Sequence, residues 1–294
     1  MSKRPPVPAL SEAPLAPGLY LVATPIGNLR DITLRALDVL NACDLVLAED
    51  TRVTAKLLTA YGLSKRMERF DEHAAAREDP RGPTTKTLAL LAEGGRVALV
   101  SDAGTPMVSD PGYGLARAAI AAGHSVFPIP GPSAALAALT LAGLPTDRFL
   151  FAGFPPPRSA ARRTFLAELA NLRATLIFFE GGSRLAASLA DMAEVFGPRP
   201  AAVARELTKL HETCVRGTLD VLARDPALDD PKGEIVIIVG PGEAEVATAA
   251  DAQSALAEAL TRLPPGEAAS EVARSLGLPR RDLYRMALAM REGR

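Results

Sequence analysis

The sequence predicts an α/β protein with two α/β domains and a small helical domain after them. Three observations support this prediction. From residue 18 onward, short apolar runs alternate with helix-patterned segments, which is typical of a mostly parallel sheet covered by helices on both faces. The stretch LPTDR at 144–148 interrupts this alternation, and a second one follows it. After residue 242 only helical patterns remain.

Composition fits a globular protein and excludes several other classes. The chain has 294 residues, of which 48% are hydrophobic and 23% charged, which is enough for two domains with real cores. No apolar run reaches the roughly 18 residues that a membrane span needs. Residues 1–17 are proline-rich, so we expect a flexible tail and not a signal peptide. Cys43 and Cys214 lie apart and the histidines are scattered, which predicts reduced thiols in the cytoplasm and no metal site.

The first predicted domain spans residues 18–146. Its strands are expected where apolar and β-branched residues run together, at 19–24, 44–50, 96–102 and 125–131. Its helices are expected where apolar residues recur at helical spacing, at 31–43, 51–62, 84–95, 112–124 and 132–143. Residues 64–83 are polar and contain two prolines, so we expect them to be irregular.

The second predicted domain spans residues 147–243 and contains a mixed sheet. Strands are expected at 149–154, 174–180, 201–207, 211–219 and 232–242, with helices at 159–171 and 183–196. No helix fits between the third and fourth of these strands, so we expect them to pair directly. Two α/β domains of this size would leave a cleft between them.

The C-terminal segment, residues 250–294, predicts a small helical domain. Two helical stripes are separated by a tight turn at Gly277, and the second helix starts near Pro279. This pattern resembles a helix-turn-helix. A plain helical hairpin is the alternative.

Four loops that follow predicted parallel strands are rich in small residues: TPIGNLRD, EDTR, SDAGTPMVSDPG and PGPSAA. Ligands bind at such carboxyl ends of strands. None of the loops has the glycine pattern of a dinucleotide site or a P-loop. The loop at 101–112 has two aspartates and no lysine or arginine, which favours a neutral or cationic ligand over a phosphate. A sulfonium cofactor fits this description, and Asp102 would bind its hydroxyl or amine groups.

Several longer motifs occur in order between about residue 18 and residue 242: ATPIGNLRDITLRAL, AEDTR, SDAGTPMVSDPG, GPSAALAALTLAGLPTDRF, IFFEGGSRL, ARELTKLHE and KGEIVIIV. With these motifs the sequence resembles the ribosomal RNA small-subunit methyltransferases of the tetrapyrrole methylase superfamily. These enzymes methylate the ribose 2′-oxygen of a cytidine in 16S rRNA. The resemblance implies two α/β domains of the class III methyltransferase type, with S-adenosyl-L-methionine folded into the cleft. It also implies a homodimer that acts on 16S rRNA in the small ribosomal subunit.

The resemblance also implies which residues contact the cofactor: Pro25, Gly27, Asp102, Thr105, Ser133, Ala134, Phe179, Ala204 and Gly233. Other interpretations remain open for four of them. Asp102 or Ser133 could cap a helix, Gly27 could permit a turn, and Phe179 could belong to the core.

Methyl transfer to a 2′-hydroxyl needs in-line geometry and help in removing the proton. Candidates for the base are Glu49, Asp50 and Glu206, and Lys209 could orient a phosphate or stabilise the forming alkoxide. Ordinary ion pairs at strand ends are the alternative for all of them.

The net charge of −1 argues against a general nucleic-acid coat, so RNA contact would depend on local arginines. We expect phosphate contacts from Arg52 and from the segment PPPRSAARR, with Arg158, Arg162 and Arg163. A solvated helix face is the other interpretation of this segment.

Two other functions remain open at this point. One is a methyltransferase of the same superfamily that acts on a tetrapyrrole or another small molecule. The other is a non-catalytic protein that binds RNA or the ribosome. The helical end and the arginines favour RNA as the substrate, and the intact SDAGTP loop argues against a lost cofactor site.

Overall fold

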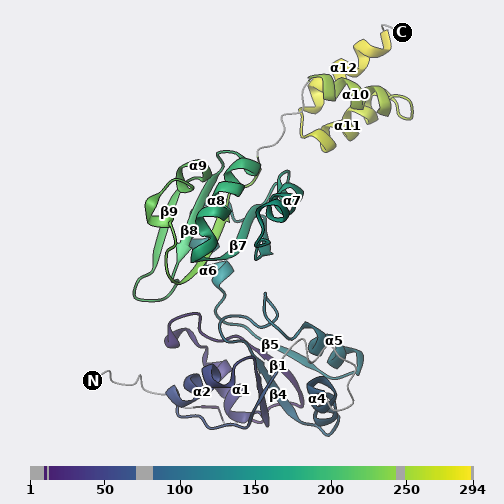
Figure 1. Ribbon diagram of the computed structural model, residues 1–294. Coiled ribbons are helices and arrows are strands. Elements are labelled where there is room, and N and C mark those ends of the chain that lie inside the picture. The colour runs from purple at the N-terminus through teal and green to yellow at the C-terminus, as the bar shows by residue number, and fades with distance from the viewer. Residues whose placement is uncertain (1–9, 12, 71–81, 243–248, 293–294) are drawn as a thin grey trace. The chain divides into compact units, whose positions relative to one another are not determined.

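The computed structural model describes residues 10–292 except 12, 71–81 and 243–248. The chain forms two compact units, the first with residues up to 170 and 174–241, the second with 171–173 and the residues from 242 onward (Figure 1). No helix in the described ranges has the length and hydropathy that would let it cross a membrane.

The first unit contains two five-stranded sheets, and the first sheet is entirely parallel, in the order β3-β2-β4-β1-β5. Its strands are β1 (Gly18–Val22), β2 (Leu45–Ala48), β3 (Met67–Arg69), β4 (Arg96–Val100) and β5 (Val126–Ile129). Four of them are strands that the apolar runs predict. β3 was expected to be irregular, because a short edge strand of one methionine and two charged residues carries no hydrophobic pattern.

Helices cover both faces of this sheet, with α1 and α2 on one side and α4 and α5 on the other (Figure 1). Their bounds are α1 (Leu34–Ala42), α2 (Thr51–Ala60), α4 (Pro83–Ala92) and α5 (Tyr113–Ala121). Leu10 and Leu15 pack against the core under α1 and α2. The predicted flexible tail therefore does not extend to residue 17, and residues 1–9 lie outside the described residues.

The second sheet is mixed, in the order β6-β7-β10-β8-β9. Only β6 and β7 run parallel, and the direct pairing of β8 with β9 confirms the prediction from the missing helix. The strands are β6 (Phe149–Gly153), β7 (Thr175–Gly181), β8 (Pro200–Arg205), β9 (Thr213–Thr218) and β10 (Glu234–Val239). One face is covered by α7 (Ser159–Leu169), α8 (Gly182–Phe196) and the short α9 (Leu219–Leu222).

The other face of the second sheet is covered by α6 (Ala134–Ala142), which follows the last strand of the first sheet. Ala138 and Leu139 of α6 pack in one cluster with Ile177 and Val236. The guanidinium of Arg216 on β9 donates hydrogen bonds to the last carbonyl groups of α6, which have no partner within the helix. Because both sheets belong to one compact unit, the domain boundary at 146 stays a prediction.

The second unit consists of α10 (Ala249–Ala259), α11 (Pro265–Leu276) and α12 (Arg280–Glu292). Its buried core includes Leu256 of α10, Val272 of α11 and Leu283 of α12. Gly277 ends α11 in the left-handed conformation with φ 66°, which is the turn expected from the sequence.

Candidate functional site

The loop after β4, residues 101–112, has an unusual backbone. Four of its residues have positive φ: Gly104, Met107, Ser109 and Gly112. This conformation is uncommon outside glycine and persists only where the surroundings impose it. At Gly112 a Cβ would lie 2.4 Å from Leu99 Cδ2, so no larger residue fits there. Tertiary contacts therefore determine the shape of this loop.

Hydrogen bonds join this loop to the loops after β1 and β5. Thr24 and Gly104 exchange two backbone hydrogen bonds, of 2.8 and 3.0 Å. The buried Ser101 hydroxyl donates to the Gly104 carbonyl at 3.1 Å, and the Thr105 hydroxyl donates to the Pro132 carbonyl at 3.1 Å. Three loops at the carboxyl ends of parallel strands are thus held as one surface, where α/β proteins bind ligands.

A cavity of about 360 Å³ lies against this surface. Its lining includes Asp102 and Ser133 from the first sheet's loops and Phe179 and Val236 from the second sheet. The volume falls in the range of small-molecule sites. The described residues that line it include no lysine or arginine, so its field favours a cation over an anion.

The cavity brings together five of the nine predicted cofactor residues: Asp102, Thr105, Ser133, Ala134 and Phe179. The other four do not line it: Pro25, Gly27, Ala204 and Gly233. Ala204 is fully buried in the cluster beneath α6. It therefore packs in the core and does not close the adenine side of a site.

Asp102 and Ser133 do not cap the helices that follow them through their side chains. Asp102 Oδ1 instead accepts a hydrogen bond of 3.0 Å from the backbone N–H of Asp50. Ser133 stands at the N-cap position of α6, but its side chain makes no capping hydrogen bond.

An aromatic group forms one wall of the cavity. The ring of Phe179 makes edge contacts with Phe151 and Phe154, at centroid distances of 4.7 and 5.5 Å. Phe154 is 55% exposed, and both it and Phe179 line the cavity. Such a wall suits a flat ring. Phe179 therefore packs in the core on one side and faces the cavity on the other.

Asp50 has a structural role at the start of α2. Its carboxylate accepts from the backbone N–H of Arg52 at 2.8 Å and binds the Arg52 guanidinium at 2.6 Å. The hydrogen bonds from Arg52 hold the pKa of Asp50 far below its usual range. A carboxylate that binds protons so weakly is a poor general base. The Arg52 side chain is largely exposed.

Glu206 and Lys209 also form an ion pair, at 2.9 Å, and neither lines the cavity. Glu206 Oε1 also accepts from the backbone N–H of Glu234 at 3.0 Å, and the hydrogen bond from Lys209 is the main cause that lowers the pKa of Glu206. Two glycines pack against this pair. A Cβ on Gly233 would lie 2.3 Å from Glu206 Oε1, and a Cβ on Gly27 would lie 2.5 Å from Lys209 Cγ.

The structure corrects the prediction for Arg162. Its side chain is 3% exposed and pairs with the buried Asp191 at 2.7 Å, so it cannot reach a phosphate. Arg163 binds Asp191 as well, and its half-exposed guanidinium also pairs with Glu194 at 2.5 Å. Arg158 is exposed and has no ion pair in the described part of the chain.

The sequence prediction assigned no role to Asp110, which lines the cavity with Glu49 and Asp102. Burial, and then the nearby charge of Glu49, raises the pKa of Asp110 to about 6. It does not cap α5, whose N-cap is Gly112. Its only signal in the sequence is a second aspartate in a loop without cations. These three carboxylates are not arranged as metal ligands. Among the described residues, no other cluster of three or more histidine, cysteine, aspartate or glutamate side chains could hold a metal ion either.

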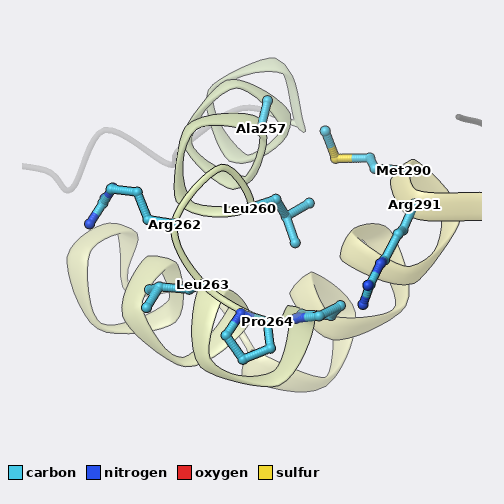
Figure 2. A pocket seen from close by; sticks show the side chains of 8 residues that line it. Ala257, Leu260, Arg262, Leu263, Pro264, Met290 and Arg291 are labelled. Atoms are coloured by element: carbon cyan, nitrogen blue, oxygen red, sulfur yellow. The ribbon is translucent and has the colours of Figure 1, made fainter.

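The second unit has a cavity of its own, of about 320 Å³. Figure 2 shows Leu260, which directly follows α10, inside it, with Met290 and Arg291 of α12 across from it. Its described lining contains arginines and apolar residues but no carboxylate. It therefore lacks the feature that makes the first cavity suitable for a cation.

Comparison with known proteins gives two family matches. Residues 18–223 match the model of the Tetrapyrrole (Corrin/Porphyrin) Methylases, and residues 246–291 match the RsmI C-terminal HTH domain. Among solved structures, uroporphyrin-III-C-methyltransferase from Thermus thermophilus superposes with a TM-score of 0.52 at 27% identity, over 76% of this chain and 93% of that one. The methyltransferase CobJ superposes with a TM-score of 0.57 at 23% identity, over 76% of this chain and 94% of that one, which shows the common fold.

Curated relatives match over nearly the whole chain. A protein of Mesorhizobium japonicum named Ribosomal RNA small subunit methyltransferase I is 52% identical, over 95% of this chain and 94% of its own length. A protein of the same name from Erythrobacter litoralis is 52% identical, over 96% of this chain and 98% of its own length. One from Escherichia coli O157:H7 is 45% identical, over 92% of this chain and 94% of its own length. The chain therefore belongs to the tetrapyrrole methylase family, within the group of ribosomal RNA small subunit methyltransferase I proteins.

Proposed function

We propose that this protein transfers the methyl group of S-adenosyl-L-methionine to the 2′-oxygen of a cytidine ribose in 16S rRNA. Family membership supports the reaction class, and the names of the curated relatives support the substrate. The observation that carries the cofactor assignment is the cavity at the strand ends, which is lined by carboxylates and by no described lysine or arginine.

The residues of the cavity fit this cofactor. S-adenosyl-L-methionine supplies an electrophilic methyl group on a positively charged sulfur, and a cavity lined by carboxylates favours that charge. Asp102 and Asp110 provide the negative charge, and Phe154 and Phe179 provide an apolar wall for an adenine ring. Thr105 and Ser133 add hydroxyl groups for the polar part of the cofactor.

The acceptor RNA would reach the cavity across an exposed basic surface. Arg158, the exposed guanidinium of Arg52 and the half-exposed guanidinium of Arg163 suit phosphate contacts. In the second unit, Arg281 is exposed on α12, and the match to an HTH domain supports RNA contact by this helix. We also propose that the protein acts as a homodimer on the small ribosomal subunit in the cytoplasm. Two large exposed apolar side chains on α5, Tyr113 and Ile120, support a subunit contact.

The test is a tritiated-methyl transfer assay with three acceptors: purified 30S particles, naked 16S rRNA and a tetrapyrrole. The expected product is labelled 16S rRNA, and nuclease mapping should place the label on a ribose. Label in the tetrapyrrole would indicate a small-molecule methyltransferase. If calorimetry detected no binding of S-adenosylmethionine, both methyltransferase functions would be excluded. A protein that only binds RNA or the ribosome would then remain.

A further inference from the structure

Three carboxylates from the loops of the first sheet line one cavity, those of Glu49, Asp102 and Asp110. Glu49 follows β2 and Asp102 follows β4, where Asp102 also holds the N–H of Asp50. Asp110 caps no helix, and no ion pair in the described chain includes it. Its half-buried carboxyl is hydrogen-bonded to Ser101. Asp110 therefore presents a carboxyl group to the cavity.

Four other carboxylates line the cavity with Asp110: Glu49 and Asp102 from the first sheet, and Glu180 and Glu234 from the second. Glu49 and Asp102 act on it from the loops of the first sheet, and both raise its pKa. From the second sheet, Glu180 and Glu234 line the same cavity, but Arg184 pairs with Glu180 at 2.5 Å and Lys209 pairs with Glu234 at 3.1 Å. The charges that raise the pKa of Asp110 are therefore those of Glu49 and Asp102.

The hydrogen bond with Ser101 lowers the pKa of Asp110, against burial and the charges of Glu49 and Asp102, which raise it. The Ser101 hydroxyl has one proton, and it donates this proton to the Gly104 carbonyl at 3.1 Å. A protonated Asp110 can donate to the Ser101 oxygen. The Asp110 carboxyl, the Ser101 hydroxyl and the Gly104 carbonyl then all have hydrogen-bond partners. An ionised Asp110 competes with Gly104 for the same proton. The hydrogen bonds thus accommodate both states of Asp110, and the charge in the cavity decides between them.

We propose that Asp110 is a specificity-determining residue, which makes the cavity prefer the cationic S-adenosylmethionine over the neutral product S-adenosylhomocysteine when the carboxyl is ionised. The inference rests on the proposed function. A cation beside the carboxyl favours its charged form, whereas a thioether gives no such stabilisation. Binding of S-adenosylmethionine near pH 6 therefore breaks the O–H bond of protonated Asp110 and releases that proton to solvent. The product shares every other charged group with the cofactor, so a comparison of the two isolates the sulfonium.

The experiment is isothermal titration calorimetry on the full chain between pH 5 and pH 8. The probes are S-adenosylmethionine, S-adenosylhomocysteine and sinefungin, which has an amine in place of the methylsulfonium group. Each titration is repeated in two buffers of different ionisation enthalpy, so that released protons are counted. We expect the preference for S-adenosylmethionine over the product to rise about tenfold from pH 5 to pH 8. This factor corresponds to a lowering of the pKa of Asp110 by about one unit when the sulfonium binds. The binding of sinefungin should show the same pH dependence as that of S-adenosylmethionine. Proton release should occur with these two ligands only.

Two matched carboxylate-to-amide variants locate the effect. Asp110→Asn should remove both the pH dependence of the preference and the proton release. Glu49→Gln should keep both but move the midpoint to lower pH, because the Glu49 charge helps to raise the pKa of Asp110. Wild-type binding without proton release, or an unchanged pH dependence in Asp110→Asn, would overturn this inference and leave the proposed function standing. Wild-type protein that binds none of the three ligands would overturn both.

Discussion

Replacement of Asp191 by alanine should strongly destabilise the first unit. The Asp191 carboxylate is 5% exposed and binds Arg162 at 2.7 Å, and that guanidinium is 3% exposed. The variant would leave Arg162 buried with only two long hydrogen bonds, to the carbonyls of Pro156 and Pro157 at 3.4 and 3.2 Å. Loss of one partner from a buried ion pair costs about 3–5 kcal/mol. For a unit of this size, that loss corresponds to a fall in melting temperature of roughly 6–20 °C.

The matched control lies one helical turn away. Glu194 is also on α8 and also pairs with Arg163, but its side chain is 58% exposed. An exposed pair contributes about 0–1 kcal/mol, so Glu194→Ala should stay close to the wild type. Arg162→Met combined with Asp191→Leu should recover most of the stability, because a buried pair can be replaced by apolar side chains of similar size.

Urea denaturation followed by far-ultraviolet circular dichroism measures the free energy of unfolding, and scanning calorimetry measures the melting temperature. The predicted order of stability is wild type, Glu194→Ala, then Asp191→Ala. If Asp191→Ala and Glu194→Ala differed by less than about 1 kcal/mol, the pair would not be buried in solution. Arg162 would then return to the set of candidate phosphate contacts.

Three further predictions concern the loops and the RNA surface. Gly27→Ala places a Cβ 2.5 Å from Lys209 Cγ and should cost about 1–3 kcal/mol in urea denaturation, whereas Gly181→Ala, with nothing within 4 Å, should be neutral. Arg158→Ala should lower the slope of log affinity against log salt for 16S rRNA by about 1, and an unchanged slope would remove this arginine from the RNA contact. Because burial raises the pKa of Asp110 to about 6 from about 4 in the unfolded chain, its contribution to the free energy of unfolding should be lost as pH rises from about 4 to about 6. A pH series of urea denaturation should show this loss in the wild type and not in Asp110→Asn.

Most strands could be predicted from the sequence because they are buried on both faces and read as continuous apolar runs. β3 could not, since its position depends on backbone pairing with β2 at an exposed edge. The partner of α6 could not be predicted either. Periodicity identifies which face of a helix is apolar, but it does not say which of two sheets that face will cover.

The candidate site divides in the same way. The loop at 101–112 was identifiable from its small residues and its lack of cations, which are properties of one short segment. Arg158 and Arg162 looked equivalent because they lie in one basic motif. The buried partner of Arg162 is 29 residues away, on another helix. The role of Asp110 depends on charges that arrive from other strands, so a single aspartate in a loop could not indicate it.

The position of α6 also constrains how the chain folds as it is synthesised. The helix leaves the ribosome directly after the first sheet, but its apolar face packs on the second. That sheet is complete only when β10 is available, because β10 lies between β7 and β8 and is the last of its strands in the chain. Until then α6 presents an uncovered alanine and leucine surface on a nascent chain whose first sheet is already made. A ribosome-bound intermediate stalled before β10 should therefore be a substrate for chaperones that recognise apolar helices.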